Sequence, residues 1–156
     1  MKKDTRKELK VSAIENGTVI DHIPSKNVFQ VIKMLNLKNI GTQITFGINL
    51  ESKKFGKKGI LKVSDKYFEI EEINKIALVA PSATLIEIKD YEVVSKKNIS
   101  IPNEIMKFVK CFNPNCITNH ENITTKFNVI NEEGEEVKLH CTYCDKITKK
   151  ENIMFI

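Results

Sequence analysis

Four cysteines in the last third of the chain constrain its fold more than any other feature. They form two short pairs, C-x4-C in "CFNPNC" (111–116) and C-x2-C in "CTYC" (141–144). Two tight turns of this kind can each present two thiolates to one tetrahedral ion, and the segment between them is long enough for a hairpin. The spacing therefore predicts one structural zinc ion per chain. The expected ligands are Cys111, Cys116, Cys141 and Cys144.

Two histidines, His120 and His140, lie close to these cysteines in the sequence. Because four thiolates already complete a tetrahedral set, we expect both histidines to be surface residues or partners that orient the ligands. A complete set also leaves no open position for water, so zinc catalysis is not expected. Free buried thiols and disulfides are the alternatives, and a reducing cytosol argues against disulfides.

A structural metal would meet a physical need of the C-terminal part of the chain. The segment "SKKNISIPNE" (95–104) is polar and aperiodic and contains a proline, which predicts a domain boundary near residue 100. Residues 101–156 then form a domain whose apolar core alone is marginal, and zinc can supply an apparent ~10–16 kcal/mol of folding free energy in such modules. We expect two domains, 1–100 and 101–156, and expect chelation to unfold the second first.

Turn and periodicity signals place the first elements of the N-terminal domain. "LKVSAIENGTVIDHI" (9–23) has apolar residues on both sides of Asn16-Gly17, which is typical of a two-residue hairpin turn. Ser25, after Pro24, can cap a helix. One strand is expected in "TQITFGINLES" (42–52), where apolar and polar residues alternate as they do in a half-buried strand. A second strand is expected in "ILKVSDKYF" (60–68). The apolar stripe expected on the helix consists of Val28, Phe29, Ile32 and Leu35.

A second helix is expected to start at the acidic segment "EIEE" (69–72), because negative charge suits a helix N-terminus, and Pro81 should end it. "ATLIEIKDYEVV" (83–94) is expected as one strand that continues past its polar Lys89-Asp90 step. The fold class is therefore α+β: an N-terminal βαββαβ-like sheet with two helices on one face, plus a small C-terminal all-β domain like a zinc ribbon. The buried face expected on the second helix consists of Ile73, Ile76, Ala77 and Ala80.

The length of the apolar stretches and the distribution of charge indicate which classes of protein this chain can belong to. The longest apolar stretch, "IALVA" (76–80), is far shorter than the ~20 residues that span a bilayer, so we expect a cytoplasmic protein. Residues 1–100 hold 18 basic and 12 acidic residues, whereas 101–156 hold 7 and 8. An excess of this size is usually a solvated surface, but it also suits a small anionic ligand.

The adjacent Asp21 and His22 are a candidate for chemistry or recognition. Neighbouring residues of a strand point to opposite faces, so an acid–base pair is disfavoured. If the strand ends at Pro24, the two side chains can splay and contact different parts of one extended ligand. The alternative is two polar residues at a strand end.

Four segments in fixed order resemble one known family. "GTVIDHIP", "ITFGINL", "ALVAPSATLIEIKDYEVV" and the two cysteine pairs are similar, in register from about Leu9 onward, to the regulatory chain of aspartate carbamoyltransferase. The resemblance implies a non-catalytic subunit that acts in pyrimidine biosynthesis. Its N-terminal domain would bind CTP or ATP, and UTP is a further candidate. Its zinc domain would dock on the catalytic chain, and regulatory homodimers would join catalytic trimers.

The resemblance also assigns roles to residues. Val11, Ala13 and Ile14 would line the base pocket, with Tyr91 and Val93 on its other side. Asp21 and Lys62 match family positions near ribose and base, and His22 and Lys96 match positions that face the triphosphate. Two departures are an isoleucine, Ile86, where family members carry asparagine, and one extra residue between Cys116 and His120.

In the zinc domain, the resemblance implies catalytic-chain contacts from Asn113 and Asn115 in the first cysteine turn and from Asp145 and Lys146 after the second. Asn and Asp also favour such turns for local reasons, so both interpretations stay open. The main rival function is a zinc-ribbon nucleic-acid-binding protein, which the charge balance of residues 101–156 does not favour. A small zinc enzyme that uses Asp21 and His22 is a second rival; it needs an open metal position or an aligned nucleophile. We expect no membrane partner.

Overall fold

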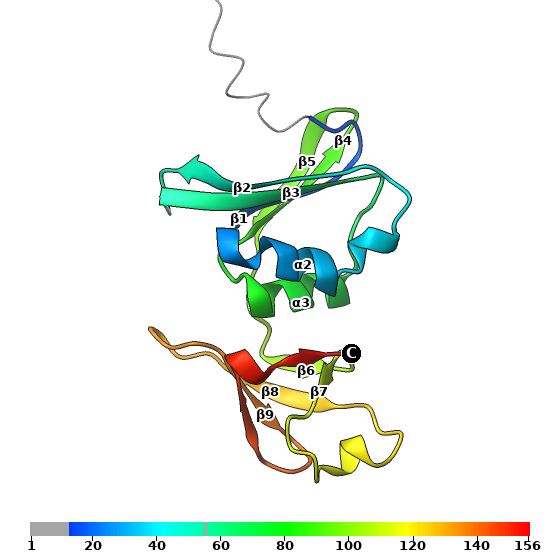
Figure 1. Ribbon diagram of the computed structural model, residues 1–156, viewed down its shortest axis with the longest axis vertical. Coiled ribbons are helices and arrows are strands. Elements are labelled where there is room, and N and C mark those ends of the chain that lie inside the picture. Colours follow the sequence, from blue (N-terminus) through cyan, green and yellow to red (C-terminus); the bar gives the residue numbers. More distant parts are fainter. Residues whose placement is uncertain (1–12, 55) are drawn as a thin grey trace, which may run out of the picture. The chain divides into compact units, whose positions relative to one another are not determined.

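The computed structural model describes residues 13–54 and 56–156. The chain divides into two compact units, a first unit that ends at Ile99 and a second unit, Ser100–Ile156 (Figure 1). Among the described residues, no helix is both long enough and apolar enough to cross a membrane.

The first unit is a five-stranded antiparallel sheet in the order β2-β3-β1-β4-β5. Both α-helices lie on the same face of this sheet (Figure 1). The other face is here called the helix-free face. The elements are β1 (Gly17–Ile23), η1 (Ser25–Asn27), α2 (Val28–Met34), η2 (Leu37–Asn39), β2 (Ile44–Ser52), β3 (Gly56–Ser64), α3 (Ile70–Val79), β4 (Thr84–Lys89) and β5 (Glu92–Asn98).

The core of the first unit forms where the helices cover the sheet. Ile20 of β1 faces Leu61 of β3 and Leu85 of β4, and all three side chains are buried. Val28 of α2 is also fully buried and lies so close to Gly59 of β3 that a side chain at the glycine would collide with it. Close helix–sheet contact therefore fixes α2 at this point.

The helix α3 forms as its sequence predicts. Glu69 is the N-cap, and its side chain and that of Glu72 make a reciprocal capping box, which satisfies backbone donors at the helix start. Ile76, Ala77 and Ala80 are buried, as expected, and so is Leu78. Ile73, which was also expected on the buried face, is only half-buried. The acidic first turn also faces the positive end of the helix dipole.

The prediction of a hairpin turn at Asn16-Gly17 is wrong, as far as the described residues show. Gly17 begins β1, and β1 pairs with β3 on one side and with β4 on the other, so it has no edge left for a preceding strand. The residues 9–12 that would form that strand lie outside the described part. The true hairpin comes later: β4 and β5 are joined by Asp90 and Tyr91, both with positive φ (52° and 66°), where one continuous strand was expected. The observed order is thus βαββαββ.

Three expectations about α2 and β2 also need correction. Ser25 does not cap α2: it lies in η1, and its hydroxyl accepts a hydrogen bond from the Asn49 amide at 3.0 Å. Of the expected stripe, Val28 and Leu35 are buried, but Ile32 is half-buried and Phe29 is 58% exposed. Val31, which was not expected, is buried with them. On the edge strand β2, the expected half-buried alternation is absent, because Phe46 and Ile48 are exposed.

The second unit is all β, as expected. A four-stranded sheet in the order β10-β9-β8-β6 accompanies a two-stranded pair, β11-β7. Phe127, Leu139, Ile105 and Val109 form its buried centre. Its elements are β6 (Glu104–Met106), β7 (Val109–Lys110), η3 (Ile117–Asn119), β8 (Lys126–Ile130), β9 (Lys138–Cys141), β10 (Ile147–Lys149), η4 (Lys150–Asn152) and β11 (Met154–Phe155).

Candidate functional site

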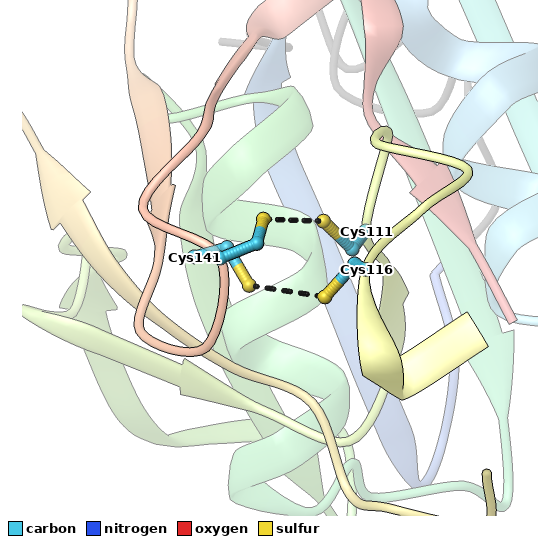
Figure 2. A group of neighbouring side chains, drawn as sticks. Cys111, Cys116 and Cys141 are labelled. Atoms are coloured by element: carbon cyan, nitrogen blue, oxygen red, sulfur yellow. Dashed lines mark hydrogen bonds between the residues drawn. The ribbon is translucent and has the colours of Figure 1, made fainter. Parts of the chain in front are cut away.

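The four cysteines come together in the second unit. Their sulfur atoms all lie within 4.8 Å of one another. The Sγ atoms of Cys111 and Cys144 are 3.7 Å apart, and those of Cys116 and Cys141 are 3.8 Å apart (Figure 2). Each short pair therefore contributes one sulfur to each contact, and the cluster joins the end of β7 to the end of β9.

Local hydrogen bonds shape the first cysteine turn. The Cys116 amide donates to the Asn113 carbonyl, and the Asn115 amide donates to Asn113 Oδ1, both at 3.0 Å. Asn119 Nδ2 donates to the carbonyls of Cys111 and Asn113. Asn113 thus has a structural task in the turn, whereas Asn115 is exposed.

The second cysteine turn closes in the same way. The Asp145 amide donates to the Cys141 carbonyl at 2.9 Å, and Asp145 has a positive φ of 62°, a conformation that Asp tolerates better than most residues. The Cys141 amide donates to the Lys146 carbonyl. The side chains of Asp145 and Lys146 remain exposed.

The protonation chemistry of the cluster fits a metal. Burial raises the pKa of the Cys111 and Cys141 thiols. For Cys144, burial also acts to raise the pKa, but hydrogen bonds from Asn113, Lys146 and the neighbouring cysteines outweigh it and lower the pKa to about 7. Buried thiols are costly to ionise alone, and a cation that binds the thiolates supplies the missing charge. Four soft sulfur donors in a closed set suit a structural metal.

The two neighbouring histidines have partners other than the sulfur atoms. His120 Nε2 lies 2.9 Å from the Pro114 carbonyl oxygen, and His140 Nε2 lies 3.1 Å from Asp145 Oδ1. Among the described residues, the close group of metal-ligating atoms here consists of the four cysteines.

A second candidate site lies on the helix-free face of the first unit. Asp21 Oδ1 is 2.8 Å from Lys58 Nζ, and both side chains are mostly buried. Burial lowers the pKa of Lys62, and the nearby Asp21 carboxylate opposes this shift. Lys96 of β5 is on the same face, since it pairs with Ile86, which in turn pairs with Val19 of β1. Three lysines and one carboxylate therefore share this face.

The Asp21-His22 pair lies in a β-bulge. Along β3, Leu61 and Gly59 pair with Ile20 and Ile23, so β1 contains one extra residue between these pairs. His22 accommodates the extra residue by adopting a positive φ of 58°. As a result Ile20 and Ile23 are both buried, although they are three residues apart.

The bulge corrects the expectation that Asp21 and His22 point to opposite faces. The His22 amide donates to Asp21 Oδ1 at 2.7 Å, and His22 Nδ1 lies 4.0 Å from Asp21 Oδ2. The imidazole Nδ1 is also 3.1 Å from the Thr84 hydroxyl. The two side chains are therefore neighbours.

An apolar cluster lies beside these charged groups. Ile14, Val19 and Ile88 are buried together, and Ile60 and Ile86 pack against them. Ala13 and Val93 are exposed, and so is Tyr91, whose amide donates to the Glu15 carbonyl at 2.9 Å. Val11 lies outside the described residues.

Sequence reasoning missed two members of this face. Lys58 stands two and four residues from Ile60 and Lys62 on β3, so the period of a strand places all three on one face. The sequence does not predict the contact between Thr84 and His22, because that contact depends on the bulge. The face as a whole combines an apolar surface with cations, which suits a ligand with a flat apolar part and a polyanionic part.

Comparison with known families covers both units. Residues 9–100 match the family model described as aspartate carbamoyltransferase regulatory chain, allosteric domain. Residues 103–154 match the model described as the metal binding domain of the same chain.

Full-length relatives carry the same description. The chain is 50% identical over 153 residues to a Bacteroides fragilis protein named aspartate carbamoyltransferase regulatory chain, covering 98% of this chain and 99% of that one. A Thermococcus sibiricus protein of the same name is 50% identical over 148 residues, with 95% and 96% coverage. One from Pyrococcus abyssi is 48% identical over 149 residues, with 94% and 97% coverage.

Proposed function

This chain belongs to the family of aspartate carbamoyltransferase regulatory chains, and we propose that it binds CTP and ATP, and UTP by the same chemistry, to control that enzyme. The proposal depends most on one observation, the combination of lysines, His22 and an apolar cluster on the helix-free face. Residues 1–100 then act as the nucleotide-binding allosteric domain. Residues 101–156 act as a zinc-binding domain that docks on the catalytic chain.

The chemistry of a nucleoside triphosphate matches the helix-free face part by part. The apolar cluster around Ile14 offers a surface for the base, which Ala13, Tyr91 and Val93 would border together with Val11. Asp21 can accept hydrogen bonds from ribose hydroxyls, and lysines supply mobile point charges for phosphates. The effector contacts proposed from charged side chains are Asp21, His22, Lys62 and Lys96, with Lys58 beside them.

Zinc is the metal that best fits the four-thiol cluster. A closed tetrahedral set of four thiolates is a common structural zinc site, and it needs no redox chemistry or open position. The proposed ligands are Cys111, Cys116, Cys141 and Cys144. Zinc would supply folding free energy to a unit that has a small apolar core.

Polar side chains beside the cluster provide a surface for the catalytic chain. Asn115, Asp145 and Lys146 are exposed, and Asn113 is partly exposed in addition to its task in the turn. Because the metal fixes both turns, these side chains can meet a partner without a large loss of loop entropy. Through such contacts the regulatory chain would bridge catalytic trimers.

The edge strand β2 supports the proposed regulatory homodimer. Phe29 and Phe46 are exposed and pack edge to face with ring centroids 5.4 Å apart, and Ile48 is exposed on the same strand. An edge strand with exposed apolar side chains is a surface that proteins usually cover. A second copy of the chain would cover it in a symmetric dimer.

Regulation requires more than binding. A nucleotide can shift the enzyme between two global states only by its differential affinity for them, typically ~1–3 kcal/mol of coupling. The assembled enzyme should therefore change its half-saturating substrate concentration when CTP or ATP saturates the regulatory chains.

Two variants, each with one lysine of β5 replaced by glutamine, test the proposal. Lys96→Gln removes a cation from the helix-free face, whereas Lys97→Gln removes its neighbour, which pairs with the buried Leu85 and belongs to the opposite face. We expect Lys96→Gln to weaken CTP and ATP binding in equilibrium dialysis by about tenfold, the value of one charge-assisted phosphate contact. Lys97→Gln should bind normally. Equal binding by both variants, or no nucleotide effect on the assembled wild-type enzyme, would refute the proposal.

A further inference from the structure

A chain of hydrogen bonds leaves the bulge at His22 and crosses two strands. The Thr84 hydroxyl of β4 is 3.1 Å from His22 Nδ1 and donates to Asn98 Oδ1 of β5 at 3.3 Å. Thr84 is only 4% exposed, so its hydroxyl has little access to water. A hydroxyl has one proton, and the bond to Asn98 uses it. The Thr84 oxygen is then placed to accept a hydrogen bond from His22 Nδ1.

Backbone bonds run beside this chain. The Ser82 hydroxyl donates to the His22 carbonyl at 3.0 Å, and the Ile99 amide donates to the Ala83 carbonyl at 3.0 Å. The short segment 82–84 is therefore held by the bulge of β1 on one side and by the end of β5 on the other. Ile99 is the last residue of the first unit.

We propose that Thr84 and Asn98 are positioning residues that connect effector binding at His22 to the point where the chain leaves the first unit. This inference rests on the proposed function, because it takes His22 as a contact of the effector. It adds a defined route by which occupancy reaches residues 98–99, two strands away from the bulge.

The position of the His22 ring would make the route sensitive to an effector. The Nδ1 atom of His22 lies against the Thr84 hydroxyl, so an effector phosphate that contacts His22 and moves its ring would change the distance to Thr84. Because the same hydroxyl bonds Asn98, that change would reach the next bond, from Thr84 to Asn98.

The decisive experiment uses the enzyme assembled with its catalytic chain and compares three variants. Asn98→Ala removes the far end of the route at an exposed position, so folding should be unaffected. Thr84→Val removes the middle with little change of shape. Thr18→Val is the matched control, because Thr18 is also fully buried in the first unit but donates to the Lys66 carbonyl at 2.6 Å, off the route.

For each enzyme, CTP affinity is measured by dialysis, and the response is the ratio of half-saturating substrate concentrations with and without saturating CTP. We expect Asn98→Ala to bind CTP within about twofold of wild type but to reduce the response ratio by up to about fivefold, the equivalent of one net hydrogen bond. Thr84→Val should reduce the response at least as much, and Thr18→Val should retain it.

A normal response of Asn98→Ala with normal CTP binding would overturn the route while leaving the proposed function intact. A loss of response in Thr18→Val equal to that in Thr84→Val would also overturn it, because the loss would then reflect general loosening of the sheet. If wild-type enzyme neither bound CTP nor responded to it, the proposed function itself would fail, and the route with it.

Discussion

A methyl group added at Gly59 tests the packing that positions β3, the strand that contains Lys58 and Lys62. An ideal Cβ at Gly59 would lie 2.1 Å from Val28 Cγ2, 3.3 Å from the Gly47 carbonyl oxygen and 3.4 Å from the Ile23 carbonyl oxygen. Carbon atoms normally pack at about 3.5–4.0 Å. Val28 is fully buried and β-branched, so it has one strongly preferred rotamer in a helix and cannot turn away. The helix α2 must therefore move.

The size of the effect follows from two opposing terms. Overpacking of a well-packed core costs about 1–3 kcal/mol. Replacing glycine by alanine also restricts the unfolded chain, which returns about 0.4–1 kcal/mol. We expect Gly59→Ala to lower the free energy of unfolding by about 1–2 kcal/mol, and the melting temperature of a unit of this size by about 5–15 °C.

Calorimetry of the metal-bound chain measures this loss, and hydrogen exchange of β1 amides identifies the transition of the first unit. Gly41→Ala is the matched control, because no atom lies within 4 Å of a Cβ added there. Combined with Val28→Ala, the Gly59 substitution should cost less than the sum of the two single changes, since the colliding methyl is gone. A melting temperature of Gly59→Ala at or above that of wild type would refute the reasoning.

Three further predictions concern the two sites. Chelation should remove the hydrogen-exchange protection of β8 and β9 while β1 and β4 keep theirs; equal loss in both units would contradict a metal that stabilises only the second. Because the pKa of Lys62 is lowered, its charge is lost at a lower pH than that of an exposed lysine, so CTP affinity should fall as pH rises through that pKa. Lys62→Arg, which stays charged, should flatten the profile measured by calorimetry, and an unchanged profile would argue against a role for Lys62. Asp21→Asn removes a negative charge 2.8 Å from Lys58 Nζ and should tighten binding of inorganic triphosphate by about fivefold, whereas weaker binding would contradict the role of the lysines.

The features that sequence predicted correctly have local causes. The acidic residues Glu69, Glu71 and Glu72 are neighbours in the sequence, and α3 begins among them, as their charge predicts. The gathering of the four cysteines follows from two short spacings, each of which forms its own turn. The α+β class of the first unit follows from local periodicity, and the all-β character of the second follows from the cysteine spacing, which is typical of a zinc ribbon.

The features that sequence missed depend on contacts between distant segments. The bulge at His22 exists because Ile20 and Ile23 both reach the core, and only the pairing with β3 shows this. The β4–β5 turn uses Asp90 and Tyr91 in left-handed conformations without a glycine. The Asp90 amide bonds the Asn16 side chain, which compensates for a conformation that the local sequence does not favour.

The bond from the Tyr91 amide to the Glu15 carbonyl joins two distant segments of the first unit's sequence, next to Ile14 of the apolar cluster. Contacts of such long sequence separation form late, after most loop-closure entropy has been lost. An effector would therefore have no site on a partly folded chain. Any ligand that binds there should raise the unfolding temperature of the first unit, by the equivalent of about 2.7 kcal/mol at one hundred times its dissociation constant.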